Sequence, residues 1–173
     1  MTTLSASERA ALLAGFERTA YRLEQRLIYT VDVASGAMNA WLAGATEASL
    51  EETDPWYEQV RTAVDAGKRY ERVRVHLDEP TPYQQWLQWT SAHNYRAGEI
   101  MRYLTRSEAD RLGVTEAVGD WWLLDEERLI WFDFDEAENQ TAELVTDPGR
   151  VAEALQWWRV AAAHSATIEV PAS

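Results

Sequence analysis

The chain has 173 residues, with 29 acidic and 16 basic side chains, a formal charge of −13, no cysteine and nine tryptophans. Because 46% of the residues are hydrophobic, the chain can bury a sizeable core, which argues against intrinsic disorder. The missing cysteines exclude disulfides, thiol catalysis and Cys-ligated metals. The negative charge disfavours direct binding to nucleic acid, which depends on cationic side chains.

We expect a single domain over residues 1–173, with a helical part over 1–67, a sheet-containing part over 68–164 and a frayed tail over 165–173. The first residues lack the basic and apolar regions of a signal peptide. No apolar run approaches the roughly 20 residues of a membrane helix. We therefore expect a cytoplasmic protein that does not enter a membrane.

The predicted elements of the first part are mainly helices. Apolar side chains at helical spacing predict an amphipathic helix over Ser7–Gln25, which Ser5 or Ser7 can cap. A run of β-branched and aromatic residues predicts a short strand next. The remaining expectations are a strand over Arg26–Asp32, a helix over Ala37–Ala43, a loop over Thr46–Asp54, and a helix that starts at Pro55, capped by Asp54, and ends at Gly67.

The middle of the chain gives the strongest strand signal. Apolar and charged side chains alternate over Arg69–Leu77, which predicts a strand with one buried face. An aromatic-rich helix is expected over Tyr83–Ala97, closed by Gly98, and a second strand over Ile100–Leu104. This order predicts a β-α-β unit with a right-handed parallel crossover.

The last third predicts an antiparallel meander and a helix. Residues Asp120–Asp135 are expected to form a hairpin that turns at Asp125–Glu127, followed by a strand over Thr141–Val145. A helix over Gly149–His164 should follow a cap at Asp147. The predicted fold is therefore α+β, with a mixed sheet of about five strands on which N-terminal helices and a C-terminal helix pack.

Charged residues on two segments could form an anion site. Arg22, Glu24 and Arg26 recur at two-residue steps, and Arg72 and Arg74 share one face of the predicted strand. Guanidinium groups bind carboxylate or phosphate with two parallel hydrogen bonds, so neighbouring segments would form a binding cluster. The competing interpretation, which we favour, is that these arginines form internal ion pairs with acidic side chains. The acidic partners considered are Glu24, Glu71 and Glu99.

Tryptophan is far more frequent than in ordinary proteins. Aromatic walls with a few polar groups are typical of small-ligand pockets, but aromatic residues at helical spacing more often form core. We expect most of the indoles to be core, with Trp89 and Trp122 lining a cavity. The candidate ligand-binding residues are Arg22, Arg26, Arg74, Trp89, His93, Glu99, Arg102 and Trp122.

The histidines His76, His93 and His164 are the general-base candidates near neutral pH. None has metal-binding spacing, and Leu77 and Asp78 follow His76, so the His-x-Lys motif of phospholipase D-type enzymes is missing. No phosphate loop, nucleophile elbow or dinucleotide fingerprint occurs. We therefore predict no catalytic residue, metal site or cofactor.

Segments in a fixed order along nearly the whole chain carry a family resemblance. They include Thr19–Arg26 with Tyr29, Asp54–Trp56, Gly67–Val75, Glu79–Pro80 with Tyr83, Asn94–Glu99, Arg102–Leu104, Asp120–Leu123, Phe132–Asp135 and Ala142–Leu144 with Asp147–Pro148. Together they resemble an actinobacterial domain of unknown function, DUF6879. Members are commonly encoded beside helix-turn-helix regulators of development and secondary metabolism, so the resemblance implies a sensory or adaptor module.

The leading functional hypothesis is a non-enzymatic regulatory module that binds a small molecule or a helix-turn-helix regulator protein, without direct nucleic-acid contact. One alternative is a small enzyme of secondary metabolism, with a substrate anchored by arginines and His93 or Glu99 as acid-base group. Another is an acidic mimic of DNA, which would place rows of carboxylates on one surface. A closed pocket in which His93, Glu99 and an arginine converge would favour the enzyme.

Overall fold

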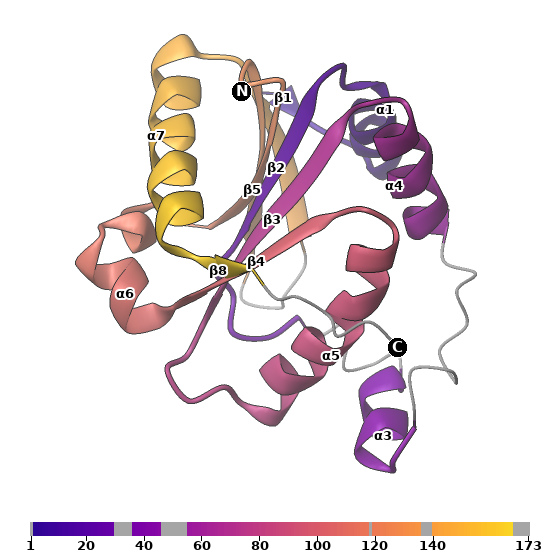
Figure 1. The fold of residues 1–173 in the computed structure, drawn as a ribbon. Helices are drawn as coiled ribbons and strands as arrows, with labels where there is room; N and C mark the ends of the chain where they lie inside the picture. The colour runs from indigo at the N-terminus through magenta and orange to yellow at the C-terminus, as the bar shows by residue number, and fades with distance from the viewer. Residues whose placement is uncertain (1, 30–35, 46–54, 118, 136–139, 168–173) are drawn as a thin grey trace.

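The computed structural model describes residues 2–29, 36–45, 55–117, 119–135 and 140–167. These residues form a mixed sheet of eight strands with helices on both sides (Figure 1). The strand order is β1-β7-β6-β5-β2-β3-β4-β8. The predicted α+β class is confirmed, whereas the prediction of about five strands is wrong.

The elements follow one another along the chain as strands separated by helices. The strands are β1 (Thr2–Thr3), β2 (Thr19–Glu24), β3 (Arg69–His76), β4 (Ile100–Thr105), β5 (Asp120–Leu124), β6 (Arg128–Phe134), β7 (Gln140–Val145) and β8 (Ala166–Thr167). The helices are α1 (Ala6–Gly15), α3 (Ala37–Leu42), α4 (Pro55–Asp65), α5 (Pro82–Arg96), α6 (Arg106–Arg111), the short 3-10 helix η2 (Val114–Glu116) and α7 (Pro148–His164).

Strand β2 lies in the middle of the sheet, where we predicted the end of a helix. Helix α1 is capped by Ser5, as expected, but it ends at Gly15. The Asp125 carboxylate then accepts hydrogen bonds from the backbone N–H groups of Glu17, Arg18 and Thr19, which fixes the start of β2. The strand expected over residues 26–32 is wrong for residues 26–29, and the rest lies outside the described residues.

The predicted β-α-β unit is confirmed, because β3 and β4 pair in parallel with α5 between them. Strands β2 and β3 form a second parallel pair, linked through α3 and α4. Helix α5 starts with a capping box formed by Thr81 and Gln84, and it is followed by Gly98 at φ +97°. A Cβ at Gly98 would lie 2.9 Å from a Val64 methyl group, so the turn brings α5 close to α4.

The predicted meander and final helix are also confirmed. Strands β5, β6 and β7 pair antiparallel, and the hairpin between β5 and β6 turns at Asp125 and Glu126, both with positive φ. The turn expected over 136–139 lies outside the described residues. Helix α7 is capped by Asp147. Within the expected tail, Ala166–Thr167 pairs with β4 as the edge strand β8, and residues 168–173 lie outside the described residues.

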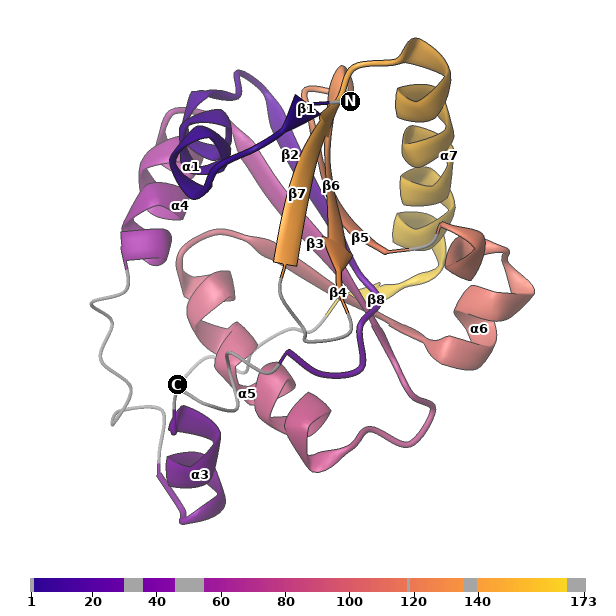
Figure 2. The ribbon, with the colours of Figure 1, turned by 180° about the vertical axis from the view of Figure 1, so that it is seen from behind.

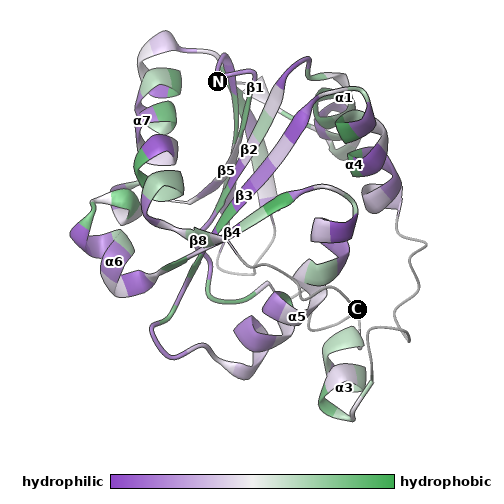
Figure 3. Cartoon of the chain, in the orientation of Figure 1, coloured by the Kyte–Doolittle hydropathy of each residue, from purple (hydrophilic) through white to green (hydrophobic). Residues whose placement is uncertain are grey.

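The helices divide between the two faces of the sheet (Figures 1 and 2). Helices α6 and α7 cover one face, over an apolar core that includes Leu23, Val73 and Trp121. Helices α1, α4 and α5 cover the other face. Figure 3 shows that β3 is largely hydrophilic, although it lies inside the sheet. The second face therefore holds polar side chains under its helices.

Candidate functional site

The polar residues of the second face come from the alternation of β2 and β3. In a strand, successive side chains point to opposite faces, so Arg22 and Glu24 lie on the face opposite Leu23. In the parallel register Arg22 pairs with Arg72, and Glu24 pairs with Arg74. All four of these side chains are buried. The two segments that we considered as an anion-binding cluster are thus neighbours in the sheet.

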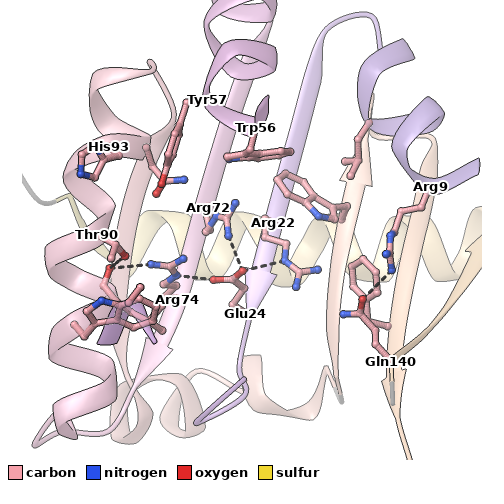
Figure 4. A pocket seen from close by; sticks show the side chains of 17 residues that line it. Arg9, Arg22, Glu24, Trp56, Tyr57, Arg72, Arg74, Thr90, His93 and Gln140 are labelled. Carbon is pink, nitrogen blue, oxygen red and sulfur yellow. Dashed lines mark hydrogen bonds and ion pairs between the residues drawn. The ribbon is translucent and has the colours of Figure 1, made fainter. Parts of the chain in front are cut away.

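Three arginines surround the Glu24 carboxylate (Figure 4). Arg72 Nη1 lies 2.6 Å from Glu24 Oε1, Arg74 Nε lies 2.6 Å from Oε2, and Arg22 Nε lies 3.3 Å from Oε1. We call these four residues the Glu24 cluster. Arg74 Nη1 also donates to the Ser91 hydroxyl and to the backbone carbonyl of Leu87 on α5.

Electrostatics keeps Glu24 ionised. Burial alone would raise the pKa of the Glu24 carboxyl, but the guanidinium groups of Arg72, Arg74 and Arg22 outweigh this effect and hold the pKa well below its ordinary value. Burial also opposes the charge on Arg74, and Glu24 overcomes this effect, so that the pKa of Arg74 is raised. The Glu24 cluster is therefore fully charged at neutral pH.

Two further carboxylates form ion pairs with the arginines of the Glu24 cluster. Glu99 lies 2.7 Å from Arg72 Nε and accepts a hydrogen bond from Asn94, and Asp120 lies 3.3 Å from Arg22 Nη2. Burial, followed by the charges of Glu24 and Asp120, raises the pKa of Tyr29 well above its ordinary value. Internal ion pairing, the interpretation that we favoured, is confirmed for Glu24 and Glu99.

The Glu24 cluster forms the floor of a pocket of about 570 Å³, which we call the sheet pocket. Its walls come from helices α1, α4 and α5 and from strands β5 and β6. Among the described residues that line it, Glu24 is the one carboxylate, beside the four arginines Arg9, Arg22, Arg72 and Arg74. Figure 4 shows these arginines in a row across the sheet. The pocket wall is thus positive in a protein with a charge of −13.

Each arginine of the Glu24 cluster keeps one terminal nitrogen outside the ion pairs. Arg22 Nη1 is buried without a hydrogen-bond partner in the described part of the chain. Arg72 pairs through Nε and Nη1, and Arg74 bonds through Nε and Nη1. Their Nη2 groups make none of the hydrogen bonds found among the described residues. Arg72 and Arg74 therefore each keep one charged terminal nitrogen for a ligand, whereas Arg22 Nη1 is enclosed by protein.

Aromatic rings form the rest of the wall. The Arg72 guanidinium carbon lies 5.4 Å from the Trp122 ring centroid and 5.9 Å from that of Trp56 on α4. The Trp86 indole N–H, on α5, is buried without a partner within the described ranges. Such contacts hold the guanidinium groups in place and provide apolar surface beside them. The sheet pocket thus combines charged donors with apolar walls.

The structure brings four of the eight candidate ligand-binding residues to the sheet pocket: Arg22, Arg74, His93 and Trp122. Glu99 pairs with Arg72 and does not line the sheet pocket. Trp89 packs against Trp41 of α3. Arg26 lies over Phe134, and Arg102 pairs with Glu71. Glu71 is two residues from Val73 on β3, so both side chains lie on the first face. Arg102, which pairs with Glu71, therefore belongs to that face.

Sequence reasoning missed several residues of the sheet pocket. Arg9 lies on α1 and Gln140 on β7, far apart in the sequence, and they join through a 2.8 Å hydrogen bond. Trp56 and Trp86 also line the pocket, where we had expected Trp89. The Asp54–Trp56 segment predicts the start of a helix and carries part of the family resemblance. Neither feature gives the direction of the Trp56 indole.

The geometry separates the acid-base pair considered for an enzyme. His93 lines the sheet pocket, with its ring centroid 5.7 Å from that of Tyr57. The Glu99 oxygens bond to Arg72 and Asn94 instead. Among the described residues, no three His, Asp or Glu side chains are placed to hold a metal ion. None of the described helices is long and apolar enough to cross a bilayer.

Two solved structures share the fold. One is TrmBL2, an archaeal chromatin protein whose structure is said to show a novel mode of DNA binding, with a TM-score of 0.53 and 12% identity over 94% of this chain. The chain spans about half, 50%, of TrmBL2. The other is Nuc, a phospholipase D family member from Salmonella typhimurium, with a TM-score of 0.55, 8% identity, and coverage of 94% of this chain and 91% of Nuc.

At such low identities these similarities concern the fold alone. Comparison with curated protein sequences gives no match. The family suggested by the ordered segments is tested more directly by its sequence profile, which matches residues 7–170. The chain therefore belongs to the family of domains of unknown function DUF6879.

Proposed function

We propose that this domain is a non-enzymatic sensory module that binds a small organic anion in the sheet pocket. The observation that carries the proposal is the Glu24 cluster. It places three buried guanidinium groups, each with one terminal nitrogen outside the ion pairs, on the floor of a 570 Å³ pocket. Charge-assisted hydrogen bonds of this kind are roughly twice as strong as neutral ones.

The size and lining of the pocket also support a small molecule. Ligand sites are typically concave and of about 300–1,000 Å³, with apolar walls and a few placed polar groups. Trp56, Trp122 and Phe132 supply the apolar surface. An organic anion with a flat apolar body would satisfy both kinds of surface.

An enzymatic role for His93 and Glu99 has less support. Both Glu99 oxygens are occupied by hydrogen bonds to buried groups, and Glu99 lies outside the sheet pocket. Removing a proton from a substrate requires a base within hydrogen-bond reach of it. His93 would have to act without that carboxylate.

A regulator protein remains the proposed recipient of the signal, on the resemblance alone. In this proposal the module reports ligand occupancy to a helix-turn-helix regulator of actinobacterial development or secondary metabolism. Direct contact with DNA is not part of it, since a charge of −13 repels phosphate groups. Co-expression with a helix-turn-helix regulator encoded beside the gene, with and without the ligand, tests separately whether the two proteins form a complex.

The pocket is tested by calorimetric titration with a panel of aromatic carboxylates and phosphates, benzoate and phenyl phosphate among them. Thr90 lines the sheet pocket on α5, so Thr90→Phe should narrow it and weaken binding. Thr62 is exposed on α4, so Thr62→Phe is the matched control and should bind normally. Binding that persists unchanged in Thr90→Phe would place the ligand elsewhere.

A second variant addresses the arginines. Arg22→Gln removes the unpartnered Nη1 group together with two ion pairs, so circular dichroism must first show that the variant folds. We expect about a tenfold loss of affinity, because the variant removes one of the three guanidinium charges beside the Glu24 carboxylate on the floor of the pocket. If Arg22→Gln does not fold, the Thr90→Phe comparison alone decides.

A further inference from the structure

We propose that the ligand of the sheet pocket carries two anionic groups on one aromatic body, the first bound by the Glu24 cluster and the second by Arg9. This inference rests on the proposed function and names the class of ligand. It follows from the position of Arg9, from the ring that Arg9 shares with Arg22, and from the distribution of charge along the pocket wall.

Arg9 supplies a cation without an acidic partner. It lies half-buried on α1, and its Nη1 group donates to the neutral Gln140 side chain at 2.8 Å. Within the described part of the chain, Arg9 forms no ion pair, although the protein has almost twice as many acidic as basic residues. Its charge is therefore available to a ligand in the sheet pocket.

A single aromatic ring relates Arg9 to the Glu24 cluster. The guanidinium carbon of Arg22 lies 4.5 Å from the Phe132 ring centroid, and that of Arg9 lies 5.6 Å from it. The two guanidinium groups can be no farther apart than these two distances combined. One benzene-sized body, packed against Phe132, can therefore extend an anionic substituent towards each of them.

The charges favour a second anionic group over a neutral one. Around the Glu24 cluster the charges balance, because the carboxylates of Glu24, Glu99 and Asp120 face the three arginines of the cluster. The cluster therefore offers free charged donors, whereas Arg9 offers charge that no acidic group among the described residues compensates. A ligand with one anion would satisfy the cluster and leave Arg9 unpaired. A second anion would pair with Arg9.

The test compares benzoate with the two dicarboxylates isophthalate and terephthalate, titrated calorimetrically into the full chain. In the unmodified protein, at least one dicarboxylate should bind about tenfold more tightly than benzoate, the value of one added charged hydrogen bond. In Arg9→Gln the dicarboxylates should lose this advantage, so that the ratio of dicarboxylate to benzoate affinity falls to about one, whatever the change in benzoate affinity itself. Arg9→Gln should fold, because Arg9 is half-buried and makes one neutral hydrogen bond.

Arg61→Gln is the matched control. Arg61 is a partly exposed helix arginine on α4, paired with Glu58 and outside the sheet pocket. The dicarboxylate advantage should survive in this variant. A general loss of positive charge would instead weaken the dicarboxylates equally in both variants, and this result would overturn the assignment to Arg9.

The remaining outcomes separate this inference from the proposed function. If both dicarboxylates bind no more tightly than benzoate, or if their advantage persists in Arg9→Gln, the two-anion ligand is wrong, whereas the benzoate site stands. If neither benzoate nor the dicarboxylates bind, the two-anion ligand is again wrong. The proposed function then falls as well only if the wider panel, phenyl phosphate included, also fails to bind.

Discussion

The two faces of the sheet are built from the same strands but hold opposite chemistry. On the face under α7, Leu23 and Val73 pack with Trp121 in a continuous apolar core. On the face under α4 and α5, the alternate residues Arg22 and Arg72 are also buried but charged. The first face is held mainly by apolar contacts, with Glu71 paired to Arg102, whereas the second needs its buried charges to be compensated.

The difference indicates where function lies. Replacing a buried ion pair by apolar residues is often neutral or stabilising, so stability alone gives little reason to keep charges on the second face. Those charges line a pocket, and the apolar core of the first face is closed by α7. The following experiments test this contrast, from the largest expected effect to the smallest.

The largest effect is expected from Glu24→Gln. This change leaves three buried arginines without their shared counter-charge, and removing one partner of a buried pair costs about 3–5 kcal/mol. Urea denaturation should therefore show a free energy of unfolding lower by about 4 kcal/mol. A loss below about 1 kcal/mol would mean that the Glu24 cluster is not buried as described.

On the apolar face, Leu123→Ala should cause the next largest loss in the free energy of unfolding. Leu123 is fully buried in the core under α7, and such truncations cost about 2–5 kcal/mol. We expect a loss of about 3 kcal/mol in the free energy of unfolding, with unchanged affinity for benzoate, because Leu123 does not line the sheet pocket. A change in affinity larger than threefold would show that the two faces are not independent.

The buried His76 should give a smaller, pH-dependent effect. Burial, reinforced by the nearby Arg74 charge, lowers the pKa of His76 from 6.5 to about 4. Between pH 6.5 and 5 the unfolded chain binds a proton that folded His76 does not, so stability falls as the pH falls, by about 1–2 kcal/mol.

His76→Gln should lose most of this dependence in urea denaturation at pH 7, 6 and 5. His164 is exposed at the end of α7, so His164→Gln is the control and should behave like the unmodified protein. Identical pH profiles for His76→Gln and the unmodified protein would contradict the burial of His76 on the polar face.

The smallest effect belongs to an ion pair outside both faces. Arg18 and Glu127 lie 3.1 Å apart with well-exposed side chains. Exposed pairs contribute about 0–1 kcal/mol, so Glu127→Gln should change the free energy of unfolding by less than about 0.5 kcal/mol. A loss comparable to that of Glu24→Gln would remove the distinction between buried and exposed carboxylates.

Much of the fold could be predicted from the sequence after residue 54, because β3, α5 and the meander have clear periodicity and turn residues. Strand β2 could not. Ala20 and Leu23 continue the helical spacing of Leu13 and Phe16, and both faces of β2 are buried, so it lacks the apolar-polar alternation of a half-exposed strand. The edge strands β1 and β8 have two residues each, too few for any pattern.

The site could be predicted only where local spacing determined it. Arg72 and Arg74 share a strand face, and their pairing with β2 follows once the two strands are neighbours. Arg9 and Trp56 reach the sheet pocket through the packing of α1 and α4, which no local pattern encodes. For the same reason Trp86 and Trp89, three residues apart on α5, could not be distinguished: Trp86 lines the pocket, and Trp89 meets α3.

The most direct test of the account is a crystal structure of the protein with 4-bromobenzoate, whose bromine can be located by anomalous scattering. We predict the carboxylate within hydrogen-bond distance of Nη2 of Arg72 or Arg74 and the ring against Phe132 or Trp122, on the face under α4 and α5. A bromine site on the α7 face, or an unoccupied sheet pocket at saturating ligand, would contradict it.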